Sequence, residues 1–202
     1  MIEAARLLRP GLLEGVSVVL AGAGTGVSSQ RRFSTAIGPA CAELGARVHL
    51  CALNPADEAS VEKMVVAAIA AMGSLDMLVV DGESLFAQGN LRSCLDASWN
   101  VTRAVVNIAF LSAEPSLRRI VYLAPSGEER PVQHVDAARA GLENLSRTLS
   151  IEWARYGITV VTIAPGTRTG AGEVAALVAY LASPAGAYFS GCLLDLTLPA
   201  SG

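Results

Sequence analysis

Residues 16–26 read VSVVLAGAGTG, and this stretch decides the fold. Its first half is a short run of β-branched and aliphatic residues, which is typical of a strand that is buried on both faces. The glycines that follow, Gly22, Gly24 and Gly26, predict a tight turn in which the backbone can approach a phosphate group at a helix N-terminus. A buried strand that ends in such a turn indicates the first unit of a parallel α/β sheet.

Strand and helix patterns alternate along the rest of the chain, separated by short connections. Further strands are predicted at residues 47–52, 75–80, 119–124, 158–163 and 192–198. Helices are predicted at residues 34–44, 59–72, 100–113, 136–156 and 173–182. We therefore predict a single domain, residues 1–202, with an α/β fold of the Rossmann type: a doubly wound parallel sheet in three layers, α/β/α.

The composition excludes several classes of function. A net charge of −3 gives no basic surface for nucleic acid or anionic lipid, and no apolar run approaches the length of a membrane span. We expect no nucleic-acid partner, no membrane association and a cytoplasmic location. The 4 cysteines stand far apart and only 2 histidines accompany them, so we expect no metal site. The apolar share of 52% indicates a large core or a surface buried against another chain.

Several longer strings resemble the short-chain dehydrogenase/reductase (SDR) family. AGAGTGV (21–27) is similar to the glycine turn of that family, and ELGARVHL (43–50) and GSLDMLVV (73–80) are similar to its second and fourth strands. ARAGLENLSRTLSIEWARYGITVVTIAPG (138–166) resembles its long active-site helix, the strand after that helix and a Pro-Gly turn. The chain is identified as a degenerate SDR member, and the short segment 53–61 implies one strand fewer than the family's usual sheet.

The resemblance implies an NAD(P)-dependent oxidoreductase in which a tyrosine and a lysine four residues later share one helix face. Aligning ARAGLENL (138–145) with the family string SKAGLEAL places Arg139 at the lysine position and Val135 at the tyrosine position. Valine has no proton to donate, and arginine stays charged and differs from lysine in shape. The family serine falls on Pro125 or, one residue later, on Ser126. We predict no catalytic residue here, with Ser126 left open.

Few other side chains could replace the tyrosine as a proton donor. His134 lies one residue before the tyrosine position, about 100° away around the helix. Tyr122 lies at the end of a predicted strand, and Lys63, the single lysine of the chain, lies on another helix. Ser98 and Asn100 fit the family's asparagine position equally well.

The cofactor positions also depart from the family pattern. Ser28 stands where the third family glycine is expected, and Ala52 replaces the acidic residue that binds the ribose hydroxyls. VDGE (80–83) replaces the family's Asn-Asn-Ala-Gly run, and a carboxylate there would repel the cofactor phosphates. We expect no bound cofactor, although the turn at residues 22–26 leaves NAD(P) binding open.

The segment after the Pro-Gly turn is too short for a substrate lid. TRTGAG (167–172) leads directly into the last predicted helix, so water is not excluded and a substrate is not enclosed. The best preserved segments are 100–113, 136–156 and 173–198, which the resemblance implies as subunit-contact surfaces.

The leading hypothesis is a non-catalytic, pseudo-enzyme subunit. It would pair through these three segments with a catalytic SDR homologue, as a heterodimer or heterotetramer, in an NAD(P)-dependent oxidoreductase complex. The resemblance implies a 3-oxoacyl or hydroxyacyl substrate for that complex. The alternatives are a divergent but active NAD(P)-dependent oxidoreductase and a ligand-binding or regulatory module.

Overall fold

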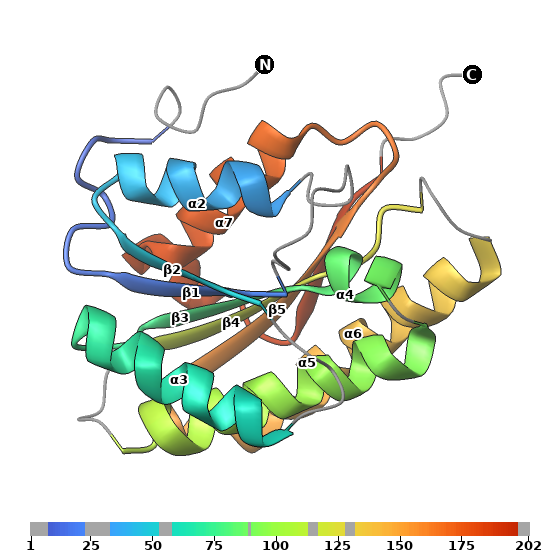
Figure 1. Ribbon diagram of the computed structural model, residues 1–202. Helices are drawn as coiled ribbons and strands as arrows, with labels where there is room; N and C mark the ends of the chain where they lie inside the picture. Colours follow the sequence, from blue (N-terminus) through green and yellow to red (C-terminus); the bar gives the residue numbers. More distant parts are fainter. Residues whose placement is uncertain are drawn as a thin grey trace.

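The computed structural model describes residues 8–22, 33–52, 58–88, 90–112, 117–127 and 132–197. These residues form a six-stranded sheet in the order β2-β1-β3-β4-β5-β6, and every adjacent pair of strands is parallel (Figure 1). The strands are β1 (Ser17–Ala21), β2 (Arg47–Cys51), β3 (Met77–Asp81), β4 (Arg118–Leu123), β5 (Ile158–Pro165) and β6 (Cys192–Leu196). The predicted doubly wound parallel sheet is confirmed.

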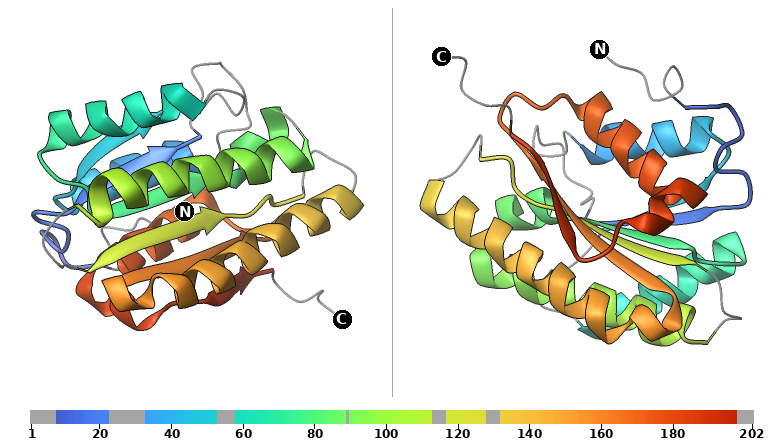
Figure 2. Two further views of the ribbon diagram at one scale, coloured as in Figure 1. Left: turned by 90° about the horizontal axis from the view of Figure 1, so that it is seen from below. Right: turned by 180° about the vertical axis from the view of Figure 1, so that it is seen from behind.

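Helices cover both faces of the sheet, which gives the three predicted layers (Figures 1 and 2). One face carries α2 (Ser34–Glu43) and α7 (Ala171–Ala182), and the other carries α3 (Glu58–Met72), α5 (Leu91–Val105) and α6 (Val132–Glu152). The shorter elements are α4 (Gly82–Gln88), the π-helix η2 (Val106–Phe110) and the 3-10 helices η3 (Ala154–Tyr156) and η4 (Pro184–Tyr188).

The sheet separates two apolar cores. In β1, Val19 and Ala21 belong to the core under α3, α5 and α6, whereas Val18 and Leu20 belong to the core under α2 and α7. Because both faces of the strand are buried, its sequence is a continuous apolar run instead of an alternating one.

β2 is one edge of the sheet, and α3 begins at Glu58 shortly after it. The five residues between the described ends, 53–57, are too few to hold a helix and another strand. The described sheet therefore agrees with the predicted loss of one strand.

Two helix boundaries differ from the sequence prediction. The helix expected to begin at residue 100 begins at Leu91, because Asn90 and Ser93 form a capping box: the Ser93 N–H donates to Asn90 Oδ1 over 3.0 Å, and the Asn90 N–H donates to Ser93 Oγ over 2.8 Å. The helix expected from residue 136 begins at Val132. Both predictions shorten a helix at its start, and at α5 the signal is the capping box and not apolar periodicity.

Three cysteine thiols are buried in the cores, and we expect them to resist alkylation. Burial raises the pKa of Cys41, Cys51 and Cys94 to about 12, from a usual value near 9. Because the thiolate is the nucleophile, their reactivity at pH 8 should fall about a thousandfold. The half-buried Cys192 should be labelled first. Iodoacetamide labelling of the folded protein, read by mass spectrometry, tests this order; rapid modification of Cys51 would contradict it.

Candidate functional site

The carboxyl ends of β1 and β3 mark the point where the strand order reverses, which is where ligands bind in open α/β sheets. Gly22 follows β1 with a φ of +105°, and a Cβ atom there would lie 3.0 Å from the carbonyl oxygen of Asp81. The close approach of the two strand ends therefore requires glycine at this position. Gly24 and Gly26 lie outside the described residues, so the phosphate turn stays a prediction.

Asp81 ends β3 and caps α4. Its buried carboxylate accepts hydrogen bonds from the Ser84 N–H over 3.0 Å and from the Ser84 hydroxyl over 2.8 Å. The cap satisfies one of the N–H groups that a helix leaves free at its start. The sequence prediction missed α4, and the signal for it is an aspartate at the end of a strand followed three residues later by serine.

Ser126, the candidate family serine, lies after β4 and is buried. Its hydroxyl donates a hydrogen bond to Glu83 Oε1 over 3.0 Å, and Glu83 lies in the first turn of α4. The carboxylate that the sequence suggested would face cofactor phosphates therefore binds the serine. The structure brings these two side chains together at the carboxyl edge of the sheet, and no local sequence pattern indicates this pairing.

Val135 lies beside the same turn. A Cβ atom on Gly127, the residue after Ser126, would lie 3.6 Å from Val135 Cγ1. Val135 is buried on α6, so an aliphatic side chain lies next to the turn that holds Ser126. The assignment of the family's tyrosine position to Val135 stays a prediction.

Arg139, one helical turn after Val135, forms an ion pair with β6. Its Nη2 atom lies 3.7 Å from Asp195 Oδ1. Burial raises the pKa of Asp195, but hydrogen bonds from the Thr197 N–H and hydroxyl and the charge of Arg139 outweigh it, so the pKa is lowered. The side chain at the lysine position therefore links α6 to the edge strand. Asp195, a charged residue within an apolar strand sequence, was missed by sequence reasoning.

The structure describes three other possible proton donors. Tyr122 is fully buried within β4, where its hydroxyl and that of Thr102 are 2.9 Å apart, and burial raises the pKa of the phenol. Tyr122 therefore cannot reach a substrate. His134 is exposed on the first turn of α6, and Lys63 is exposed on α3.

The two candidates for the family's asparagine position, Ser98 and Asn100, both lie on α5. Ser98 is fully buried on α5, and its hydroxyl donates to the Cys94 carbonyl oxygen within the same helix over 2.7 Å. Asn100 is half-buried, two residues further along α5. The Ser98 hydroxyl thus satisfies its own helix.

The connection from β5 to α7 is short, as the sequence predicted. Its Thr169 side chain is hydrogen-bonded both within the connection and to the end of β6. The Gly166 N–H donates to Thr169 Oγ1 over 2.8 Å, and the Thr169 hydroxyl donates to the Leu196 carbonyl oxygen over 3.0 Å. A cavity of about 360 Å³ lies beside this connection. Its described lining residues are Thr169, Glu173, Asp195, Leu196 and Thr197.

The described residues depart in three ways from the pattern by which SDR proteins hold a nicotinamide dinucleotide, and NAD(P) binding stays open. Ala52, exposed after β2, has no group that could bind ribose hydroxyls. Arg139 is paired with Asp195, and the carboxylates of Asp81 and Glu83 bring negative charge to the switch point. Residues 23–32 lie outside the described structure, so binding of the cofactor phosphates is untested there.

In the described part of the chain, no helix is long and apolar enough to cross a membrane. No group of three or more His, Cys, Asp or Glu side chains there could hold a metal ion.

Comparisons with known proteins give one family. Residues 14–172 match the model of a protein family that is described as Enoyl-(Acyl carrier protein) reductase. A Mycobacterium tuberculosis protein, (5R,7aS)-5-hydroxy-7a-methyl-1-oxo-2,3,5,6,7,7a-hexahydro-1H-indene-carboxyl-CoA reductase, is 27% identical over 246 aligned residues, covering 93% of this chain and 94% of the relative. The alignment is longer than the 202 residues of this chain, so the relative has segments that this chain lacks.

Two further relatives are similar. The (2S)-[(R)-hydroxy(phenyl)methyl]succinyl-CoA dehydrogenase subunit BbsD of Thauera aromatica is 32% identical over 136 residues, which cover 60% of this chain and 53% of the relative. The solved structure of a citronellol catabolism dehydrogenase, AtuB, from Pseudomonas aeruginosa has a TM-score of 0.69 at 25% identity and covers 94% of this chain and 96% of that one. The fold, the matched residues and these relatives agree, and the chain belongs to the enoyl-(acyl carrier protein) reductase family of short-chain dehydrogenases/reductases.

Proposed function

We propose that this chain is a non-catalytic SDR subunit that supports a catalytic SDR partner in an NAD(P)-dependent oxidoreductase complex. The observation that carries the proposal is the pair of side chains on α6. Val135 is buried beside the Ser126 turn and has no proton to donate to a substrate carbonyl. Arg139 forms an ion pair with Asp195. In an assembly, the partner chain would supply the proton donor and hold the cofactor.

The relatives support a thioester-linked substrate for the complex. The M. tuberculosis relative is named as a reductase of a carboxyl-CoA compound, and the T. aromatica relative as a subunit of a [hydroxy(phenyl)methyl]succinyl-CoA dehydrogenase. We infer that the partner acts on a 3-oxoacyl or hydroxyacyl thioester. The complex would work in the cytoplasm, where the free cysteines stay reduced.

The contact surface would comprise α5 with η2, the C-terminal part of α6, and the segment from α7 to β6. Two large apolar side chains stand exposed on these helices: Trp99 on α5, 40% exposed, and Ile151 on α6, 79% exposed. Buried aromatic and aliphatic side chains provide much of the binding energy at protein interfaces. A partner that covers both would remove this apolar area from water.

Co-expression with a neighbouring SDR-like chain tests the assembly. We expect the two chains to co-purify at the mass of a heterodimer or heterotetramer. Replacing Ile151 with glutamate should weaken the assembly at least about tenfold, because a charge would be buried at the contact. Val66 on α3, 55% exposed and outside the proposed surface, provides the control: Val66→Glu should leave co-purification unchanged. A folded wild-type chain that never co-purifies would contradict the proposal.

A second candidate is an active reductase, favoured by the hydrogen bond between Ser126 and Glu83 at the carboxyl edge of the sheet. Bound NAD(P)H would supply hydride to a substrate carbonyl. The Ser126 hydroxyl, which is hydrogen-bonded to Glu83, would supply the proton. Fluorescence titration of the purified chain with NADH and NADPH separates the candidates. Saturable binding of one dinucleotide per chain supports the active reductase, and its absence supports the non-catalytic subunit.

A further inference from the structure

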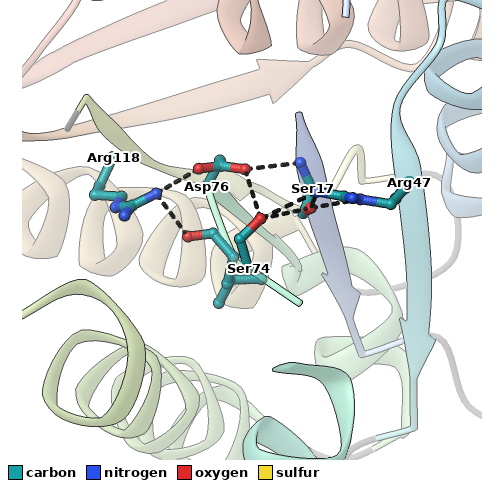
Figure 3. Close-up of polar contacts among 6 residues, drawn as sticks. Ser17, Arg47, Ser74, Asp76 and Arg118 are labelled. Carbon is teal, nitrogen blue, oxygen red and sulfur yellow. Dashed lines mark hydrogen bonds and ion pairs between the residues drawn. The ribbon is translucent and has the colours of Figure 1, made fainter. Parts of the chain in front are cut away.

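Two consecutive arginines at the start of β4 are buried at the amino end of the sheet, opposite the site described above. Arg118 and Arg119 point to opposite faces, as neighbours on a strand do. The Arg118 Nη1 atom donates to the Leu75 carbonyl oxygen over 3.1 Å and pairs with the Asp76 carboxylate (Figure 3). The Arg119 Nη2 atom donates to the Ser183 carbonyl oxygen over 2.8 Å. Each guanidinium is thus placed near the C-terminal end of a helix.

A third arginine joins the same network from β2. Arg47 donates through Nε and Nη2 to Ser17 Oγ, over 3.1 and 2.9 Å, and through Nη2 to Ser74 Oγ over 3.2 Å (Figure 3). Both acceptors are neutral hydroxyls. Asp76, which also accepts from the Ser17 N–H over 2.9 Å, is the carboxylate of the network as the described residues form it.

Three arginines lie at this end of the sheet, and the structure describes one carboxylate, that of Asp76, in their network. Arg118 pairs with Asp76, whereas Arg119 lies on the other face of the sheet and the exposed Arg47 donates to hydroxyls. The C-termini of α3, α7 and the α5–η2 helix lie at this end, and each contributes about −0.5 of a charge. The sum of these charges at the amino end of the sheet is positive. Burial lowers the pKa of Arg119, and the nearby charge of Asp76 opposes this shift.

The hydrogen bonding is incomplete as well. The Nε atoms of Arg118 and Arg119 are buried and have no hydrogen-bond partner among the described residues. A buried donor without an acceptor costs about 1–3 kcal/mol, so native structures rarely keep one without a compensating ligand, water or strain.

A cavity of about 220 Å³ lies against Arg118. Ser74 and Ser112 line it with hydroxyls, while Ile108 and Ala109 line it with apolar surface. Both apolar residues belong to η2, where the helix widens to bonds five residues apart, as in the Leu111 N–H to Val106 carbonyl bond of 2.9 Å. Such π-helical turns are frequent at functional sites. Ser112 is exposed, so the cavity reaches the surface.

We propose that this cavity binds a small organic carboxylate with an apolar body. The carboxylate would lie towards Arg118 and Ser74, where it adds the negative charge that the network lacks. The apolar body would lie against Ile108 and Ala109. Cavities of about 150 Å³ hold a benzene ring, so the available volume admits an aryl or short branched chain. The site lies at the opposite end of the sheet from the Ser126 turn, and it does not depend on the function proposed above.

Thermal unfolding with benzoate, and with benzamide as its neutral counterpart, tests the site at constant ionic strength. We expect benzoate to raise the melting temperature saturably, by about 3–5 °C at roughly ten times its dissociation constant. Benzamide should give a much smaller shift, because it lacks the charge that Arg118 would meet. Equal shifts with the two compounds, or no shift with benzoate, would overturn the proposal.

A blocking variant locates the effect without removing the buried arginine, whose loss could unfold the chain. Ser112→Trp places a large ring at the mouth of the cavity, and it should abolish the benzoate shift. Ala67 is exposed on α3 and does not line the cavity, so Ala67→Trp should retain the full shift. A benzoate shift that survives Ser112→Trp would refute the assigned location.

Discussion

Replacing Asp76 with alanine is expected to lower the free energy of unfolding by about 3 kcal/mol. The Arg118 side chain is only 8% exposed and that of Asp76 22%, so the substitution leaves a buried guanidinium without its counter-ion. It also removes the acceptor for the Ser17 N–H, which holds β1 to the segment before β3. Urea unfolding followed by circular dichroism measures the change, and the melting temperature should fall by about 6–12 °C.

An exposed ion pair provides the matched control. Arg92 Nε and Asp96 Oδ2 lie 3.3 Å apart on the surface of α5, at i,i+4 spacing. Asp96→Ala should cost about 0.5 kcal/mol or less, because water and salt screen such pairs. If Asp76→Ala lowered the free energy of unfolding no more than Asp96→Ala does, the network at the amino end of the sheet would not stabilise the fold.

The inner strands β1, β3, β4 and β5 could be predicted because each contains an apolar run that is buried on both faces, whereas the edge strands β2 and β6 are only partly buried. The helix starts could not be predicted as well. α5 begins at Leu91, directly after Asn90, where a capping box supplies the signal. α4 has seven residues, too few to show a helical period, and only its Asp81 cap marks it.

The candidate site divides in the same way. Val135 and Arg139 could be placed from sequence because both lie on one helix, where i,i+4 spacing fixes their common face. Their partners come from other elements, and no local pattern reports them. Ser126 meets Glu83 from 43 residues away, and Arg139 meets Asp195 on the edge strand. Tertiary packing decides these pairings, and the sequence alone leaves them open.

The proposed non-catalytic role would account for both the α6 ion pair and the short β5–α7 connection. Arg139 reaches Asp195 on β6, and Asp195 lines the open cavity beside that connection. A longer connection would cover this cavity, and a lysine at position 139 would be needed beneath it for the family's chemistry. Both changes therefore affect one region, the space between α6, β6 and the start of α7.

Replacing Gly82 with alanine is expected to destabilise the fold by about 3 kcal/mol, and to disturb the Ser126 turn. A Cβ atom at this position would lie 2.5 Å from the carbonyl oxygen of Leu123 and 2.9 Å from Leu142 Cδ1. The leucine side chain on α6 can shift, but the β4 backbone is held in the sheet on both sides and cannot. α4 would move instead, and with it Glu83, which follows Gly82 directly and accepts the Ser126 hydrogen bond.

Two other helical glycines separate this clash from the general effect of adding a methyl group. At Gly38 in α2 the nearest atom beyond its chain neighbours lies 3.6 Å from an added Cβ, but Pro39 follows and disfavours a Cβ on the helical residue before it. Gly38→Ala should therefore change the free energy of unfolding by less than about 1 kcal/mol. At Gly141 the Cβ would meet only the ends of the Leu95 side chain, at 2.9 Å, so Gly141→Ala should fall between the other two variants. Urea midpoints of the three variants should follow this order, and a Gly82→Ala protein as stable as Gly38→Ala would show that the β4 backbone yields.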